Sequence, residues 1–308
     1  MEIYLPIAEQ SMNVFVLLAL GGAAGLLAGM FGVGGGFLAT PLLIFVGIPP
    51  AVAVASQANQ VVANSISSLQ VQWRRGNVDL RMGLILLLGG MVGSSAGVTL
   101  FTYLKRIGQI DFVIAVLYVV MLSAIGGLMM YESLGTWLKR RRNPTAPRGK
   151  LHTHYLVHRL PWKMRFYKSK LYISAFLPIG LGFVIGVLSA ILGVGGGFVL
   201  VPAMIYLLGM PTTVVIGTSN FQILFVAANV TFLQATTNGT VDVVLALLLI
   251  LGGVVGAPIG ARIAAKLPGV VLRGLMAVLI LAVAAELLTE LLRTPASPYS
   301  IGLREAQP

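Results

Sequence analysis

Cysteine is absent from this chain of 308 residues, and charged residues make up only 10% of it. Without cysteine the protein has no disulfide, no thiolate ligand for a metal and no cysteine nucleophile. Soluble domains carry roughly a quarter charged residues, so the charges here are too few to coat a soluble surface of this size. These two absences exclude soluble enzymes, nucleic-acid-binding proteins and disulfide-stabilised domains as descriptions of the whole chain.

Apolar residues are abundant instead: the AVILMFWYC set makes up 57% of the chain, and 37 glycines add to it. Apolar runs of about 20 residues recur, and each is long enough to cross a bilayer as a helix. We therefore predict an all-α polytopic membrane protein with about ten helical segments. Two of them have only about 12 residues, or ~18 Å of helix, which is too short to cross the bilayer upright. The expected segments are Met12–Phe31, Phe37–Ile48, Ala51–Trp73, Leu80–Leu104, Ile110–Ser133, Tyr172–Leu192, Phe198–Met210, Thr212–Thr236, Val241–Leu267 and Val270–Leu292.

The two halves of the chain repeat one another. Gly32-Val33-Gly34-Gly35-Gly36-Phe37 recurs as Gly193-Val194-Gly195-Gly196-Gly197-Phe198, and a proline follows four residues after each phenylalanine. The matches continue in the same order: Gln60 matches Gln222 after a one-residue insertion, and Asp79 matches Asp242 after another. We expect a single membrane domain over residues 1–308, consisting of repeat 1 (12–133), a basic loop (134–171), repeat 2 (172–292) and a polar tail (293–308).

The relative orientation of the halves depends on how many times each crosses the membrane. Five crossings per half would invert the second half relative to the first. Four crossings per half, with each short segment forming a broken helix with its neighbour, would give eight crossings in all and leave the two halves parallel. The linker after the third segment carries Arg74 and Arg75, but its counterpart 237–240 has no basic residue, which favours inversion. Eleven of the 21 lysines and arginines lie between Lys139 and Lys170, so that loop is expected in the cytoplasm. No basic residue precedes the first apolar run, so a cleaved signal peptide is not expected.

The glycine motifs are the first candidate for a binding site. Four glycines within five positions should break a helix, so the next helix begins with free backbone N–H groups, which favour an anion. Unwound backbone is tolerated inside a membrane where it lines a cavity or is covered by protein. The alternative is close helix packing at a tight turn without a ligand. The candidate residues are Gly32, Gly34, Gly35 and Gly36 in the first copy and Gly193, Gly195, Gly196 and Gly197 in the second.

A polar stripe follows each glycine motif. Its spacing of three and four residues places Gln57, Gln60, Asn64 and Ser67 on one helical face, with Asn59 beside it. The second half has Thr218, Ser219, Asn220 and Gln222 at the corresponding place. Amides facing lipid are costly, so this face should point at protein or water. It can line a substrate path, or it can form hydrogen bonds between helices.

The remaining motifs favour structure over chemistry. Glycines four residues apart, as in Gly89, Gly93 and Gly97, allow helices to approach closely. The stretch 93–97 matches the G-x-S-x-G pattern around Ser95, but it lies in an apolar helix without a positioned base, so no catalytic residue is expected. Asp79 and Asp242 each begin a helix, where capping explains them. No metal site or cofactor is expected, since the three histidines are loosely spaced in the basic loop.

The paired glycine motifs, followed by Pro41 and Pro202, resemble those of the TauE/SafE-type sulfite exporter family of membrane permeases, over about residues 13–292. The resemblance implies transport of small anions, often sulfur oxyanions or organosulfonates, across the bacterial plasma (inner) membrane. It also implies that the two glycine stretches are the substrate-site loops, and that Ser56–Gln60 and Thr218–Gln222 line the site beside them.

The expected function is therefore a secondary transporter that exports a small anion, such as sulfite or sulfoacetate, by alternating access. Uptake and a channel-like pore stay open as alternatives, as do an intramembrane hydrolase built on Ser95 and a non-transporting membrane scaffold. The expected partners are the anionic substrate and the lipid bilayer. Proton or sodium coupling and a homo-oligomer are left open, and no nucleic acid is expected.

Overall fold

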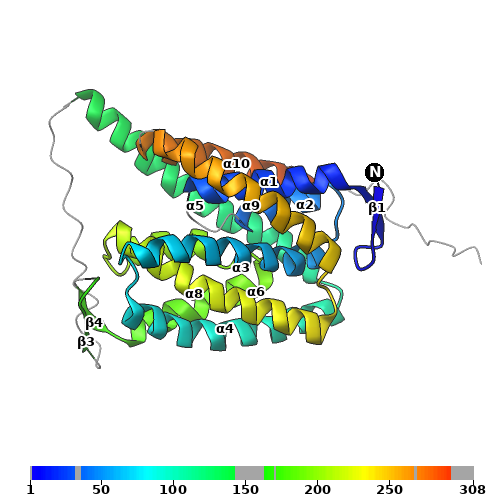
Figure 1. Ribbon diagram of the computed structural model, residues 1–308, viewed down its shortest axis with the longest axis horizontal. Coiled ribbons are helices and arrows are strands. Elements are labelled where there is room, and N and C mark those ends of the chain that lie inside the picture. Colours follow the sequence, from blue (N-terminus) through cyan, green and yellow to red (C-terminus); the bar gives the residue numbers. More distant parts are fainter. Residues whose placement is uncertain (1, 32–35, 143–162, 170, 267–268, 293–308) are drawn as a thin grey trace, which may run out of the picture.

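The computed structural model describes residues 2–31, 36–142, 163–169, 171–266 and 269–292. Within them the chain forms ten α-helices and two antiparallel β-hairpins, so the predicted all-α polytopic fold is confirmed (Figure 1). The helices of the first half are α1 (Val14–Phe31), α2 (Gly36–Phe45), α3 (Pro50–Arg74), α4 (Leu80–Arg106) and α5 (Ile110–Arg142). Those of the second half are α6 (Phe176–Leu192), α7 (Gly197–Tyr206), α8 (Thr212–Leu233), α9 (Val243–Lys266) and α10 (Gly269–Leu292), with a π-helical turn, η2 (Gln234–Asn238), after α8.

The structure differs from the predicted segments mainly at the polar edges of the apolar runs. Helix α5 ends nine residues beyond the expected Ser133, at Arg142. Part of the expected basic loop 134–171 and the start of the expected segment Tyr172–Leu192 form a hairpin of β3 (Lys163–Phe166) and β4 (Leu171–Ser174). A hairpin of β1 (Glu2–Leu5) and β2 (Gln10–Asn13) precedes α1 in the same way. Figure 1 shows the two hairpins at opposite ends of the helical bundle.

Length and composition separate the helices into three groups. Within the described residues, four are long and apolar enough to cross a membrane: Leu80–Arg106, Ile110–Gly135, Thr213–Asn238 and Val243–Gly260. Five shorter apolar helices are Val14–Met30, Gly36–Phe45, Phe176–Leu192, Gly197–Tyr206 and Gly274–Thr289. Helix α3 has 25 residues but is rich in Gln, Asn and Ser. Burial accounts for its polarity, because its first half, from Ala51 to Ala58, is entirely buried in protein.

Glycines bring helices of the two halves together in pairs. A Cβ on Gly25 would lie 2.5 Å from the Gly253 Cα, and one on Gly21 would lie 2.8 Å from the Leu249 Cα, so α1 and α9 run parallel in backbone contact. Helices α4 and α6 pack in the same way, through Gly89 against Ile179 and Gly93 against Phe183. The predicted role of the spaced glycines in close helix packing is thus met in both pairs.

Corresponding helices of the two halves are antiparallel. The Asp79 N–H, just after α3, donates to Thr218 Oγ1 near the start of α8 at 3.0 Å. The Asp242 N–H, just before α9, donates to Ser56 Oγ near the start of α3 at 2.9 Å. Each end of α3 therefore lies beside the opposite end of α8. Helices α5 and α10 are also antiparallel, since Gly126 faces Ile280 whereas Ser133 faces Gly274. These directions agree with the inverted alternative rather than the parallel one.

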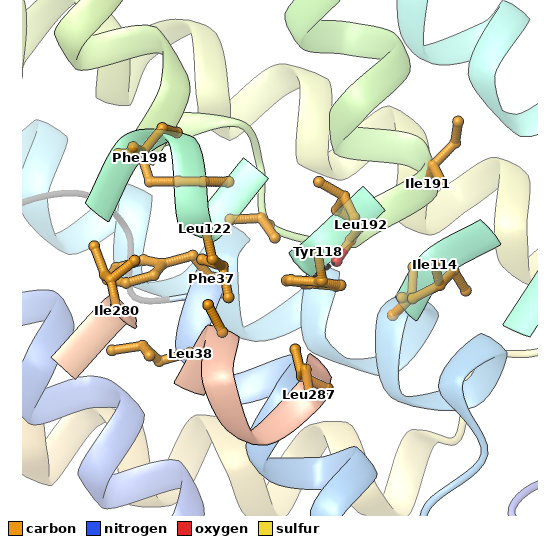
Figure 2. Close-up of a cluster of buried hydrophobic side chains, with 14 of the residues drawn as sticks. Phe37, Leu38, Ile114, Tyr118, Leu122, Ile191, Leu192, Phe198, Ile280 and Leu287 are labelled. Atoms are coloured by element: carbon orange, nitrogen blue, oxygen red, sulfur yellow. Dashed lines mark hydrogen bonds between the residues drawn. The ribbon is translucent and has the colours of Figure 1, made fainter. Parts of the chain in front are cut away.

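The largest hydrophobic core joins both halves around the short helices (Figure 2). Phe37 of α2 and Phe198 of α7 are stacked, with ring centroids 5.6 Å apart. Tyr118 of α5 is buried among them, and its hydroxyl donates to the Leu192 carbonyl at the end of α6. The core thus fixes the start of each short helix, which is where the glycine motifs lie.

Candidate functional site

The second glycine motif is a buried turn that only glycine adopts easily. Gly193, Gly195 and Gly196 have φ values of 68°, 67° and 73°, in the left-handed region where a Cβ is unfavourable. Gly193 ends α6 and Gly196 immediately precedes α7. The predicted break between two helices is confirmed here. In the first motif Gly36 begins α2, whereas Gly32, Gly34 and Gly35 lie outside the described residues.

Side chains of α3 and α8 pack closely against this turn. A Cβ on Gly195 would lie 2.5 Å from Val61 Cγ1 and 2.7 Å from Ile223 Cγ2, and a Cβ on Gly36 would lie 2.7 Å from Val61 Cγ2. Gly193 is equally close to the backbone of Val54. Close packing therefore accounts for the glycines of the second motif without a ligand, and the case for binding has to come from the polar groups nearby.

Gln57 is a buried polar residue on the face of α3 that packs against the glycine turns, and its amide has no hydrogen-bond partner. Its side chain is fully buried, and neither its Nε2 nor its Oε1 has a hydrogen-bond partner among the described residues. It lies three residues after Val54 and four before Val61, both of which touch the glycine turns, so it shares their helical face. A buried amide with both groups unpaired is uncommon, because each unpaired group costs about 1–3 kcal/mol.

Gln60 and Gln222, the matched glutamines of the two halves, are placed alike but bonded differently. Gln60 Nε2 donates to the Gly21 carbonyl at 3.1 Å and to the Leu249 carbonyl at 3.0 Å, which ties α3 to both α1 and α9. Gln222 is equally buried, yet both its amide atoms lack a partner within the described part of the chain. Gln60 therefore forms hydrogen bonds between helices, whereas Gln222 has unused donors and acceptors.

The other predicted residues form hydrogen bonds between helices or within their own helix. Thr218 accepts the Asp79 N–H, and Asn220 donates to Ser68 Oγ and to its own helix. Ser219, the counterpart of Gln57, donates to the Ile216 carbonyl at 3.1 Å. Asn59 donates to the Ser56 carbonyl of its own helix, and half-buried Asn64 lies near Gly253. The structure thus brings Gln57 to the glycine turns. Thr218 and Asn220 form contacts between elements, and Asn59 and Ser219 are hydrogen bonded within their own helices.

Backbone donors and neutral side chains dominate the electrostatics of this region. At the start of α7, the N–H groups of the first helical turn have no acceptor within the helix. The N-terminal end of α7 also carries the positive end of the helix dipole. Among the described side chains the only buried charged groups are Asp79 and Asp242, and no lysine or arginine is buried. Any anion here would depend on neutral donors.

Sequence reasoning identified Asp79 and Asp242 only as helix caps, and the structure adds a second role. Their Oδ1 atoms accept from the Met82 and Leu245 N–H groups, which confirms the capping. Their Oδ2 atoms accept from hairpins of the opposite half: Asp79 from the Ser169 N–H and hydroxyl, and Asp242 from the Ile7 N–H. The alternation of charged and apolar residues in 163–166 was the available signal for the second hairpin.

The geometry gives no support to the hydrolase alternative. Ser95 is exposed, and its hydroxyl donates to the Met91 carbonyl of its own helix at 2.9 Å. Asn229, which is not a base, lies 3.3 Å from it. Within the described residues no group of three or more His, Asp or Glu side chains could hold a metal ion. The three histidines of the basic loop lie outside the described part.

Comparison with known proteins places these features in a family. The family model described as sulfite exporter TauE/SafE matches residues 17–287. A probable membrane transporter protein of Xylella fastidiosa (strain 9a5c) is 31% identical over 79% of this chain and 81% of its own length. The probable membrane transporter proteins YunE and YjnA of Bacillus subtilis (strain 168) are 26% and 28% identical, over 91% and 79% of this chain and 98% and 87% of their own lengths. No solved structure matches the chain significantly. The names describe transporters rather than enzymes, and the chain belongs to the TauE/SafE family of membrane transporters.

Proposed function

We propose that this transporter exports a small oxyanion, of the sulfur oxyanion or organosulfonate class, across the bacterial plasma membrane. The site is formed by Gln57 and the N-terminal end of α7. The single observation that carries the proposal is Gln57, which is fully buried on the α3 face that touches the glycine turns and has no partner for either amide group. The family description names sulfite export, which supports the proposed substrate class and direction.

A bound anion would accept hydrogen bonds from donors that have no partner in the protein. An oxyanion accepts hydrogen bonds, and both Gln57 Nε2 and the first N–H groups of α7 can donate them. Since these donors are neutral, they hold an anion less tightly than a buried lysine or arginine would. Moderate affinity suits a transporter, because the substrate must leave again on the other side of the membrane.

Alternating access is supported by the directions of the helices. In transporters with inverted repeats, the substrate lies between the repeats near the middle of the bilayer, and one part rocks against the other. Helices α3 and α8 are antiparallel counterparts whose side chains Val61 and Ile223 meet at Gly195. The candidate site thus lies where the two halves face each other, which is where such a mechanism needs it.

The test compares Gln57→Leu with Gln70→Leu. Both changes remove an amide from α3, but Gln70 is exposed. Purified protein is heated with and without sodium sulfite, and sulfite flux is measured in liposomes. A bound ligand raises the melting temperature by mass action. We expect Gln57→Leu to keep or increase the melting temperature without sulfite, because leucine leaves no unpaired amide, and to lose both the sulfite-dependent rise and the flux.

Gln70→Leu should keep both responses, which shows that an amide lost elsewhere on α3 is harmless. Wild-type flux in Gln57→Leu would remove this residue from the binding site. A wild-type protein that neither transports sulfite or an organosulfonate nor gains stability from them would overturn the proposed function as a whole.

A further inference from the structure

The charged side chains around the candidate site carry information about the charge of the substrate. All nine lysines and arginines whose burial the structure describes are exposed: Arg74, Arg75, Arg81, Lys105, Arg106, Arg165, Lys168, Arg262 and Lys266. The two buried charged groups are Asp79 and Asp242, which are negative and already hydrogen bonded. An anion at Gln57 would therefore meet no buried cation from the described part of the protein.

The cost of burying charge then limits the substrate. Moving an ion out of water costs free energy in proportion to the square of its charge, so a dianion costs about four times as much as a monoanion. Neutral amides and a helix dipole, which is equivalent to about half an elementary charge, can offset the smaller cost far better than the larger one. Gln57 also has an unpaired carbonyl oxygen, which needs a donor. Hydrogensulfite supplies one through its proton, and a sulfonate supplies one where it carries a hydroxyl group, whereas the sulfite dianion has none.

We infer that the transported species is a singly charged oxyanion, such as hydrogensulfite or a simple sulfonate, and that dianions are excluded. The inference rests on the proposed function and names the charge state that the same site accepts. It separates substrates that the family resemblance groups together, because sulfoacetate carries two negative charges at neutral pH and hydrogensulfite carries one.

Two measurements in liposomes containing the full chain test the inference. The first compares isethionate with sulfoacetate, two sulfonates of similar size of which only sulfoacetate carries a carboxylate. We expect transport of isethionate and none of sulfoacetate. The second follows sulfite flux against pH. Above the second pKa of sulfurous acid the flux should fall about tenfold per pH unit, because only the protonated share is carried. Isethionate flux across the same pH range is the control for effects on the protein itself.

The outcomes distinguish this inference from the proposed function. Transport of sulfoacetate at the rate of isethionate, or a sulfite flux that stays constant or rises with pH, would overturn the inference and leave an anion transporter. If the protein transports neither sulfonate, the pH dependence of sulfite flux alone tests the inference. No flux and no thermal stabilisation with any of these anions would instead overturn the proposed function.

A second inference comes from the unequal bonding of Gln60 and Gln222. The two side chains approach matching glycines: a Cβ on Gly253 would lie 2.6 Å from Gln60 Nε2, and a Cβ on Gly90 would lie 2.7 Å from Gln222 Nε2. The acceptors also match, since the Leu86 carbonyl lies against Gly182 as the Leu249 carbonyl lies against Gly21. Gln60 nevertheless forms both hydrogen bonds, and Gln222 forms none within the described residues.

We propose that the two glutamines are positioning residues that stabilise opposite access states. In the state seen here Gln60 holds α3 to the α1–α9 pair, and Gln222 is released from the α4–α6 pair. Inverted halves can exchange conformations, so in the opposite state Gln222 bonds to α4–α6 and Gln60 is released. Each glutamine then has a buried amide NH₂ group that is unpaired in one of the two states, which keeps the free energies of the two states close.

The absence of native cysteine allows a direct test by cysteine accessibility. Ser65→Cys and Ala227→Cys are matched reporters at equivalent, fully buried positions of the antiparallel helices α3 and α8, so they lie toward opposite sides of the membrane. Each reporter is combined with Gln60→Leu and, separately, with Gln222→Leu, and its labelling by a polar maleimide is measured. We expect each glutamine variant to increase the labelling of one reporter and decrease that of the other. The reporter whose labelling increases should differ between Gln60→Leu and Gln222→Leu.

Partial unfolding is distinguishable from a shift between states, because it would expose both reporters in both variants. That pattern would overturn the proposal. The proposal would also be overturned if both glutamine variants increased the labelling of the same reporter. It would likewise be overturned if neither variant changed the labelling seen in the proteins that carry the reporter cysteine alone.

Discussion

Alanine at Gly182 would add one methyl group at a point of close backbone contact between α6 and α4. The new Cβ would overlap the Leu86 carbonyl and lie 3.1 Å from the Gly90 backbone nitrogen. Both neighbours are backbone atoms, so no side-chain rotation can relieve the overlap, and the two helices must separate. Two residues earlier, Gly180 lies on the same helix with no neighbouring atom within 4 Å of an added Cβ. Gly180→Ala is therefore the matched control.

The expected difference in stability between Gly182→Ala and Gly180→Ala follows from comparing the two substitutions. In a helix interior alanine is more favourable than glycine by up to about 1 kcal/mol, and this gain is common to both variants. The difference between them is the cost of overpacking, about 1–3 kcal/mol. At roughly 2–4 °C per kcal/mol for a protein of this size, Gly182→Ala should melt about 2–12 °C below Gly180→Ala.

Thermal unfolding of the purified variants in one detergent, followed by circular dichroism, measures this gap. Gly180→Ala should melt at or above the wild-type temperature. Equal melting temperatures for the two variants would show that α4 and α6 are not in backbone contact, and would refute the packing argument for the whole set of spaced glycines.

Three further predictions address the turns, the hairpins and the serine motif. Gly195→Ala and Gly209→Ala both place alanine at a positive φ, at a cost of about 1–2 kcal/mol. Only Gly195 has neighbours within 4 Å, so its variant should have the lower melting temperature and reduced transport. Asp242→Ala removes the cap of α9 and the acceptor for the β1–β2 hairpin, so stability should fall by about 0.5–2 kcal/mol and hydrogen exchange in residues 2–13 should rise. Ser95→Ala should keep wild-type flux, because the Ser95 hydroxyl donates to the Met91 carbonyl and accepts from the Asn229 amide, and neither group is a base.

Each of these predictions has a clear contrary result. Equal stability of the two glycine variants would mean that Val61 and Ile223 do not restrict Gly195. Unchanged exchange in the hairpin of Asp242→Ala would show that the carboxylate does not hold it. Loss of flux in Ser95→Ala, or labelling of the wild-type protein by a fluorophosphonate, would favour the hydrolase alternative again.

The helices could be predicted from the sequence because lipid permits few solutions. An apolar run inside a bilayer must satisfy its own backbone hydrogen bonds, so the runs had to be helices, and the predicted starts of α4 and α5, at Leu80 and Ile110, are the observed ones. The helix break at Gly193 was predictable for a similarly local reason, since clustered glycines disfavour a helix. Local sequence was sufficient for prediction wherever the conformation depends on only a few neighbouring residues.

The hairpins and the bonding of the polar stripe could not be predicted, because distant residues determine both. The β3–β4 hairpin lies in a basic stretch. It is held by Asp79, in the other half of the chain, whose carboxylate accepts hydrogen bonds from the Ser169 N–H and hydroxyl. Periodicity placed Gln57 and Gln60 on one face, but nothing local distinguishes a glutamine that bonds to two helices from one that has no partner. That difference depends on where α1 and α9 lie, which the sequence of α3 does not contain.

The π-helical turn after α8 explains how the two halves keep matching contacts despite an insertion. Gln60 and Gly76 are 16 positions apart, whereas Gln222 and Gly239 are 17 apart. In a regular α-helix one extra residue would rotate everything beyond it by about 100° and would carry Asp242 away from Ser56. A π-helical turn accommodates an extra residue within the helix, and η2 at Gln234–Asn238 lies in this interval. The Asp242 N–H then reaches Ser56 at 2.9 Å, as the Asp79 N–H reaches Thr218 at 3.0 Å. The effect of this insertion is therefore confined to one turn, and the antiparallel contact between α3 and α8, which the proposed alternating access requires, is the same at both ends of α3.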